Sequence, residues 1–440
     1  MSEASSVREP ALAARIEQAR RLAESGHVLR AEQAFLGILR DAPAEVDALN
    51  FVAICAHERG QYQQALALLE RARHVRPDDP TTLTNLGVAQ QVLGRFDDAV
   101  ASLRAALQVA PDLFVAKLRL ANVLEAAGRA EQALPLYFGA IFGAQQRGSW
   151  LSEATTAPGM RPLVLHAMRT VAPGRRRVFG ELLVPLRERY GVDAMARVER
   201  CLAIYLQEMP ANYADPQQRP KFLYFPDLPT QRYFDRALFP WYADLEARAD
   251  AIRDEMLAVL AEDSGFEPFL GHFDGPEQLE GQLAGTRGTP AWNAFFFFRH
   301  GDAYEQNRKR CPRTAAALDD VVPLCRIRDH APEVCYSVLT PGSHILPHHG
   351  VTNTRAVTHL PLVVPEDCAL VVGGEARSWE AGRCFTFDDT FEHEAWNRSE
   401  RTRVVMLMDV WNPYLTEAER LAITDLTVAI GEFNSAAGIS

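Results

Sequence analysis

The chain has 440 residues, of which 48% are hydrophobic and 23% are charged, and its formal net charge is -11. These values are typical of a globular protein with room for two or three domains. The acidic balance argues against a nucleic-acid surface, which needs clustered positive charge. We see no signal peptide and no run of about 18 apolar residues. The seven cysteines are scattered without a CxxC pair, so we expect reduced core thiols and a cytoplasmic protein.

The first third of the sequence is repetitive. Four glycines recur every 34 residues, at Gly26, Gly60, Gly94 and Gly128. Each is followed five residues later by an alanine, and prolines at positions 43, 77 and 111 keep the same period. This pattern predicts helix pairs in which glycine forms the turn and proline marks the end of the second helix. It resembles the tetratricopeptide repeat, with four repeats over residues 11–146.

Such repeats stack into an α-helical solenoid, because one helix pair cannot bury its apolar face alone. The concave surface of a solenoid implies that it binds a peptide or a protein. A role in dimerisation, or as a spacer, stays open as the alternative.

Residues 147–218 are expected to be a helical connector, interrupted by proline and glycine in "EATTAPGMRPLVLHAMRTVAPG". A second domain, residues 219–418, begins with the aromatic-rich stretch "RPKFLYFPDLP". The spacing of apolar residues then predicts one helix from about Trp241 to Leu260. Residues 419–440 are expected to form a C-terminal helix or tail.

From about Trp292 onward the pattern changes to short strands. Six strand-like runs are separated by turn signals such as "PEDC" and "GGEARSWEAG": "AWNAFFFF", "EVCYSVLT", "RAVTHLPLVV", "CALVVG", "CFTFDD" and "RVVMLMDVW". Several short strands at regular spacing indicate a sandwich or a barrel. A jelly roll is one such fold, and its mouth is a ligand cavity.

Two histidines and one arginine carry the chemistry that these strands suggest. His348 lies in the histidine-rich stretch "ILPHHGVTNTRAVTHL", and His393 lies 45 residues later at the end of a strand. Imidazoles from different strand ends can converge at a barrel mouth and bind a first-row metal. Alternation along a strand places Arg403 on one face with Val405 and Leu407, where a guanidinium can hold a carboxylate.

The segments "PHHGVTNTRAVTHLPL", "SWEAGRCFTFDDTFEHEAWN" and "RVVMLMDVWNP" resemble the aspartyl/asparaginyl β-hydroxylase family of Fe(II)- and 2-oxoglutarate-dependent oxygenases. The resemblance implies a double-stranded β-helix, the jelly-roll fold of that family. It also implies that His348 and His393 bind iron and that Arg403, helped by Ser337, holds the distal carboxylate of 2-oxoglutarate. His359 would lie near the other carboxylate.

Many related oxygenases have a carboxylate ligand two residues after the first histidine, where this chain has Gly350. The family that it resembles lacks this ligand, so two histidines and a bidentate 2-oxoglutarate would hold the metal. Asp388 and Asp389, close to His393, are expected to orient the loop or the imidazole rather than to bind metal.

Two departures from the animal members affect the cosubstrate site. Those members have an arginine where this chain has Val357 and a tryptophan where it has Phe298. The first change removes a partner for the metal-proximal carboxylate, and Arg355 and Arg299 are the candidates to replace it.

The resemblance therefore implies a dioxygenase that uses Fe(II), 2-oxoglutarate and O2 to hydroxylate the β-carbon of Asp or Asn in a peptide or protein. The repeats would recruit that substrate, with no nucleic acid and no membrane span involved. The alternatives are hydroxylation of a small molecule or a lipid acyl chain, halogenation at the vacant ligand position, and a repeat scaffold with an inactive oxygenase domain.

Overall fold

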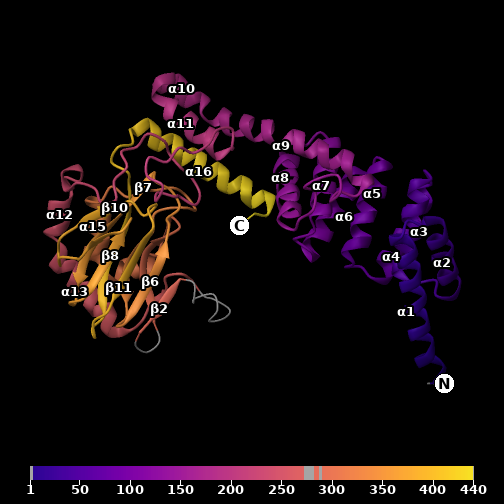
Figure 1. Ribbon diagram of the computed structural model, residues 1–440, viewed down its shortest axis with the longest axis horizontal. Helices are drawn as coiled ribbons and strands as arrows, with labels where there is room; N and C mark the ends of the chain where they lie inside the picture. The colour runs from indigo at the N-terminus through magenta and orange to yellow at the C-terminus, as the bar shows by residue number, and fades with distance from the viewer. Residues whose placement is uncertain (1–2, 272–281, 287–289, 440) are drawn as a thin grey trace. The chain divides into compact units, whose positions relative to one another are not determined.

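The computed structural model describes residues 3–271, 282–286 and 290–439. The chain forms two compact units: one comprises Met1–Arg176 with Glu432–Ser440, and the other is Arg177–Gly431 (Figure 1). None of the helices in the described ranges is both long enough and apolar enough to cross a membrane.

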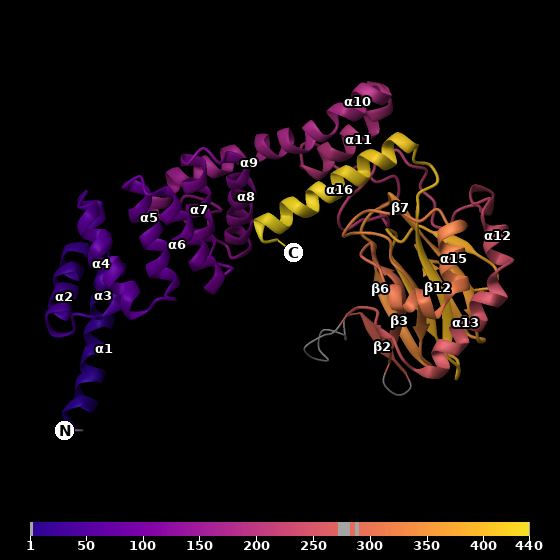
Figure 2. The ribbon, with the colours of Figure 1, turned by 180° about the vertical axis from the view of Figure 1, so that it is seen from behind.

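The first unit contains the predicted solenoid, whose eight helices form four consecutive antiparallel pairs (Figure 2). They are α1 (Glu3–Glu24), α2 (Val28–Asp41), α3 (Val46–Glu58), α4 (Tyr62–Val75), α5 (Pro80–Val92), α6 (Phe96–Val109), α7 (Phe114–Ala126) and α8 (Ala130–Gln146). The four periodic glycines lie between the helices of a pair, with φ between +73° and +78°. This left-handed conformation is one that only glycine adopts readily, which explains the 34-residue period.

Small residues let the helices of a pair approach closely. The four alanines that follow the glycines are at most 1% exposed. A Cβ atom at Gly87, in α5, would lie 2.5 Å from Cγ of Leu103 in α6. The α5–α6 packing therefore depends on the absence of a side chain at that position.

The connector is helical only between Pro158 and Tyr205 and not over residues 206–218, and one expected interruption is absent. After a short 3₁₀ turn (η1, Pro158–Met160) come α9 (Arg161–Leu182), α10 (Val184–Tyr190) and α11 (Val192–Tyr205), and α9 continues through Pro173 and Gly174. Gly174 lies against Leu134 of α8, where an added Cβ would come within 2.5 Å of a methyl carbon. The segment is thus helical where it packs against α8, although proline and glycine disfavour helix locally.

The helix predicted from Trp241 to Leu260 is in fact two helices. α12 (Tyr242–Glu246) and α13 (Ala249–Glu262) are separated at Ala247 and Arg248. The backbone N–H of Arg248 donates to Leu245 rather than four residues back, so the α-helical ladder is interrupted there.

The β region consists of two antiparallel sheets in the described part of the chain. In sheet order, the seven-stranded sheet contains β1 (Glu267–Pro268), β3 (Trp292–Arg299), β5 (Val334–Leu339), β12 (Arg403–Trp411), β7 (Arg355–Val363) and β10 (Phe385–Phe387), with β4 (Asp302–Ala303) beside β3. The five-stranded sheet contains β2 (Leu283–Gly285), β6 (Ser343–His348), β11 (His393–Asn397), β8 (Cys368–Val372) and β9 (Glu375–Arg377). From β5 to β12 the chain alternates between the sheets, apart from the β8–β9 hairpin, as in the expected double-stranded β-helix.

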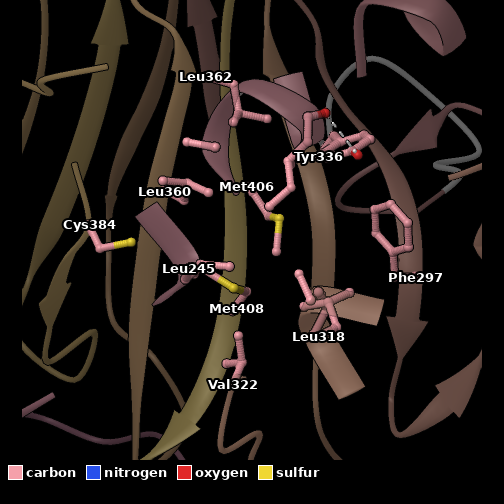
Figure 3. Close-up of a cluster of buried hydrophobic side chains, with 14 of the residues drawn as sticks. Leu245, Phe297, Leu318, Val322, Tyr336, Leu360, Leu362, Cys384, Met406 and Met408 are labelled. Carbon is pink, nitrogen blue, oxygen red and sulfur yellow. Dashed lines mark hydrogen bonds between the residues drawn. The ribbon is translucent and has the colours of Figure 1, made fainter. Parts of the chain in front are cut away.

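Helices cover the outer face of the seven-stranded sheet. α12, α13 and α15 (Pro312–Asp320) contribute Leu245, Met256 and Leu318 to a core that contains alternate residues of the sheet, including Met406 and Met408 of β12 (Figure 3). α14 (Glu305–Arg310) precedes α15, and α16 (Glu417–Ala437) follows β12.

The opposite residues of β12 point between the two sheets. Val405 and Leu407 belong to this inner core, together with Val357 of β7 and Trp292 and Phe296 of β3. The predicted face of Arg403, Val405 and Leu407 is therefore the inner one, and it is here that the candidate site lies.

Candidate functional site

His348 and His393 lie directly opposite each other in the five-stranded sheet. His348 is the last residue of β6 and His393 the first of β11, and the two are antiparallel partners. Their ring centroids are 4.0 Å apart. The structure thus brings together the two imidazoles that the sequence placed 45 residues apart.

A β-bulge turns His348 toward the interior. Between the pairs His393–His348 and Ala395–Ile345, β11 advances by two residues and β6 by three. Ile345 faces the inner core, and regular alternation would give His348 the same orientation as His344, whose ring contacts Glu394 and Trp396. The extra residue in β6 re-aims the imidazole, as bulges near functional sites often do.

Both imidazoles use Nδ1 for a hydrogen bond to the backbone, which leaves Nε2 of each ring for a ligand. The Nδ1 atom of His348 lies 2.8 Å from the carbonyl oxygen of Leu346, and that of His393 lies 3.0 Å from the carbonyl of Phe391. A carbonyl only accepts, so each Nδ1 carries the proton and each Nε2 keeps its lone pair. Burial lowers the pKa of both histidines to about 4, and for His348 the adjacent His393 adds to this. Neutral imidazoles with free Nε2 atoms suit a metal ion.

No third acidic or sulfur ligand completes a cluster with these histidines within the described residues. At Gly350 there is no room for one, because an added Cβ would lie 2.2 Å from Cγ of Asp389. The Asp389 carboxylate occupies that space, and its Oδ1 is buried without a donor in the described structure. It is therefore an available acceptor near the histidine pair, and the orienting role predicted for it stays a prediction.

Arg403 is 2% exposed and has no carboxylate partner among the described residues. Its Nη1 makes long contacts of 3.4 and 3.5 Å with the carbonyl and hydroxyl oxygens of Ser337, and its Nε has no acceptor. Burial lowers the pKa of Arg403 to about 10. A buried guanidinium without an anion is costly, so this position is suited to a carboxylate ligand.

His359 also faces this interior, and Trp379 fixes its protonation. The indole N–H of Trp379 donates to Nδ1 of His359 over 3.1 Å, and both side chains are 6% exposed. Burial, with the nearby Arg403, keeps the pKa of His359 well below its ordinary value. The neutral ring must therefore carry its proton on Nε2, as a donor.

Trp379 and Trp292 are site residues that were not predicted from the sequence. The Trp379 ring lies over Arg403, with the guanidinium carbon 5.0 Å from the ring centroid. The indole of Trp292 donates to the Ser337 hydroxyl over 2.9 Å. Trp379 lies inside the quoted segment "SWEAGRCFTFDDTFEHEAWN", which was the signal that could have found it, whereas Trp292 is marked only by its place at the start of a strand.

Neither candidate replacement for the missing arginine is free. Arg355 is bonded to Asp409, and Arg299 lies 2.8 Å from Glu267. Val357 leaves an apolar wall on the inner face, whereas Phe298 lies in the helix-covered core, away from the site. The hypothesis that Arg355 or Arg299 compensates for Val357 is therefore not supported, and the change at Phe298 does not alter the inner face.

A segment outside both sheets holds the two histidine-bearing loops. The backbone N–H of Arg219 donates to Thr390, and that of Lys221 donates to Gly350. The Gln218 amide donates to Asp388, and the buried Asn353 side chain makes two hydrogen bonds with the backbone of Phe225. The segment 218–225 therefore ties the end of β6 to the start of β11.

The domain that contains these residues matches a known protein family. Residues 246–413 match the family described as Aspartyl/Asparaginyl beta-hydroxylase. The chain carries an aspartyl/asparaginyl β-hydroxylase domain. Tetratricopeptide repeats match residues 16–80, 80–105 and 93–147, so the repeats precede the hydroxylase domain.

The similar curated proteins are named as hydroxylases or as proteins with such a domain. Aspartate beta-hydroxylase domain-containing protein 2 of Mus musculus is 33% identical over 242 residues, 54% of this chain and 66% of that protein. The aspartyl/asparaginyl beta-hydroxylase of Homo sapiens is 26% identical over 389 residues, 88% of this chain and 46% of that protein. An ornithine lipid ester-linked acyl 2-hydroxylase of Rhizobium tropici is 33% identical over 42% of this chain and 62% of its own.

The matched stretches thus span less than two thirds of each of these relatives. A solved structure of MamA is 28% identical, covers 29% of this chain and 75% of its own, and has a TM-score of 0.26.

Proposed function

We propose that the hydroxylase domain is an Fe(II)- and 2-oxoglutarate-dependent dioxygenase that hydroxylates a side chain of a peptide or protein, at the β-carbon of Asp or Asn. His348 and His393 would hold the metal through their Nε2 atoms. Arg403, Ser337 and His359 would hold 2-oxoglutarate. The observation that carries the proposal is the buried Arg403 guanidinium, which has no anion as partner in the described residues and lies on the inner face of one sheet, while the neutral histidine pair belongs to the other sheet.

The donor set fits this cosubstrate at both of its ends. An arginine with two parallel N–H donors matches one carboxylate, and the Ser337 hydroxyl lies beside it. The Nε2–H of His359 is a second donor for an oxygen of the ligand. The fit with Fe(II) rests on two neutral imidazoles as the protein ligands, so that the other coordination positions would be left for 2-oxoglutarate and O2.

When bound, the iron would supply the redox chemistry by which O2 and 2-oxoglutarate become succinate, CO2 and one oxygen atom inserted into a substrate C–H bond. The protein residues bind and orient. Backbone carbonyls fix the imidazole tautomers, and Trp379 fixes that of His359. Asp389, with its free buried Oδ1, offers an acceptor next to His348. The apolar wall around Val357 and Leu407 excludes water.

The peptide substrate is supported by the extent of the likeness. The match to the human aspartyl/asparaginyl beta-hydroxylase covers 88% of this chain, which includes most of the repeats. Tetratricopeptide repeats typically bind peptides or proteins on their concave surface. We therefore propose that the repeats recruit the polypeptide that the domain modifies.

A lipid acyl chain is the second candidate, because the Rhizobium acyl hydroxylase is 33% identical to part of this chain. That match covers 188 residues, 42% of this chain, against 389 residues for the human hydroxylase. Both candidates predict a product that is 16 Da heavier than the substrate. The products can still be distinguished, because a hydroxylated peptide and a hydroxylated acyl chain separate by extraction.

The test measures succinate formed from 2-oxoglutarate with Fe(II) and O2, and searches peptide and lipid fractions of a lysate for a gain of 16 Da. We expect turnover by the wild type, loss of turnover in His348→Ala, and the mass gain in the peptide fraction. Equal turnover by both proteins would remove the site assignment, and a mass gain confined to lipid would favour the second candidate.

A further inference from the structure

A pocket of about 480 Å³ opens on the hydroxylase domain at the end of β8 and β11 that lies away from the histidine pair. The turn between β7 and β8 forms one side of it, with Glu366 and Asp367. Trp396 of β11 and Trp379 form others. None of the residues assigned to iron or to 2-oxoglutarate lines this pocket, so it is separate from the proposed catalytic site.

The lining combines aromatic rings with negative charge. Glu366 and Asp367 are exposed, and neither has an ion-pair partner among the described residues. Trp396 is half-buried and already contacts a cation, because the guanidinium carbon of Arg398 lies 4.3 Å from its ring centroid. Arg398 does not line the pocket. Indole rings beside carboxylates favour a cation, above all the planar guanidinium of an arginine.

Trp379 is shared by this pocket and the proposed cosubstrate site. Trp379 is one of the residues that line the pocket, its N–H donates to His359, and its ring centroid lies 5.0 Å from the guanidinium carbon of Arg403. Cys368 also lines the pocket, and the charge of Arg403 acts on its thiol by lowering the pKa, against the larger effect of burial, which raises it. A side chain bound in the pocket would therefore limit the motion of Trp379, which contacts both His359 and Arg403.

We propose that this pocket is a second binding site, which takes an arginine side chain of a bound polypeptide and is coupled through Trp379 to the cosubstrate site. The binding step stands independently, whereas the coupling rests on the proposed function. Because linkage is reciprocal, an occupied pocket strengthens 2-oxoglutarate binding and 2-oxoglutarate strengthens occupancy of the pocket.

The binding test uses two probes that differ only in charge, N-acetyl-arginine methylamide and N-acetyl-citrulline methylamide. Full-length protein without metal or 2-oxoglutarate is titrated with each probe, and the indole N–H resonances of its six tryptophans are followed by NMR. Trp379→Phe and Trp396→Phe assign the two resonances. We expect the arginine probe, and not the citrulline probe, to shift both.

A charge-neutral variant of the pocket and a matched control decide the site. Glu366→Gln with Asp367→Asn should weaken the arginine probe by about 2- to 30-fold, the range for two exposed ion pairs. Asp244→Asn with Asp254→Asn removes the same charge from exposed positions of α12 and α13 and should leave the affinity unchanged. Equal shifts by both probes, no shift of Trp396, or equal weakening by both double variants would overturn the site.

The coupling is measured as the Kd for 2-oxoglutarate in Zn(II)-loaded protein, with and without saturating arginine probe. We expect at least about a 3-fold tighter Kd with the arginine probe and no change with citrulline. An unchanged or weaker Kd would overturn the coupling while the NMR result stands. Failure of 2-oxoglutarate to bind in either condition would instead remove the proposed function, and the coupling with it.

Discussion

His348 and His393 face each other across one antiparallel pair, with ring centroids 4.0 Å apart and both Nδ1 atoms bonded to backbone carbonyls. Replacing either histidine with alanine should weaken Fe(II) binding and turnover by roughly 10- to 100-fold or more. Mutation of residues that only hydrogen-bond to a metal ligand already has effects of that size. Metal titration and succinate formation provide the measurements. His344→Ala, in the same strand with its ring on Glu394, is the matched control and should keep both.

Replacement of Arg403 should affect the protein in opposite ways with and without ligand. Arg403→Met removes a buried guanidinium that lacks an anion, so the thermal stability of the cosubstrate-free protein should rise. The same change should weaken 2-oxoglutarate by about 2–5 kcal/mol, the loss when one partner of a buried charge pair is removed. Thermal melts with and without 2-oxoglutarate test both parts. A variant that is still stabilised by 2-oxoglutarate as strongly as the wild type would contradict the assignment.

An aspartate at position 350 should not create a third metal ligand. Because a Cβ there would lie 2.2 Å from the Asp389 carboxyl carbon, we expect Gly350→Asp to destabilise the fold by about 1–3 kcal/mol. Urea unfolding measures the loss. Combining it with Asp389→Ala removes the clashing atoms and should restore most of the stability. If the single variant unfolded at the same urea concentration as the wild type, the packing argument would fail.

Trp379→Phe keeps an aromatic ring but removes the N–H that donates to His359. We expect 2-oxoglutarate to bind about 2- to 10-fold more weakly, which corresponds to one hydrogen bond. The ¹⁵N shifts of His359 distinguish orientation from general damage, because the wild-type ring should show a proton on Nε2 and the variant a mixture of tautomers. An unchanged tautomer in the variant would mean that another group fixes the ring.

Glu333 should make stability depend on pH. Burial, with the nearby Asp409, raises the pKa of this carboxyl to about 7. In the unfolded chain it ionises near 4.3, so between about pH 4.5 and 7 the folded protein holds more protons and its free energy of unfolding falls as pH rises.

Glu333→Gln lacks the ionisable carboxyl that causes this pH dependence. Its free energy of unfolding relative to the wild type should therefore increase by about 1–3 kcal/mol from pH 5 to pH 7.5. Urea unfolding at the two pH values gives the comparison. Because the His300 ring contacts Glu333 over 2.8 Å, His300→Gln is measured alongside. A difference that is the same at both pH values would count against the raised pKa.

The sequence could predict what depends on periodicity and alternation. A 34-residue period specifies the helix pairs, since glycine in a left-handed turn and small buried residues recur with it. Strand alternation placed Arg403 with Val405 and Leu407 on the inner face, and the structure confirms that face. The likeness of the motifs to a hydroxylase family agrees with the family match over residues 246–413.

What the sequence could not show depends on single contacts between distant residues. One extra residue in β6 decides that His348 faces inward, and no local signal distinguishes that bulge from a regular strand. The donor to His359 is Trp379, 20 residues later and beyond two further strands, and Arg355 is bonded to Asp409, 54 residues away. Pro173 lies inside a helix because packing outweighs local propensity.

The family match begins at residue 246, yet Gln218, Arg219 and Lys221 are what fasten the loop after β6 to the loop before β11. A protein trimmed to the matched boundary would keep His348, His393 and Arg403 but would lose these hydrogen bonds to the two loops. The family match thus includes both histidines, whereas some of the hydrogen bonds that hold their two loops come from residues upstream of the match.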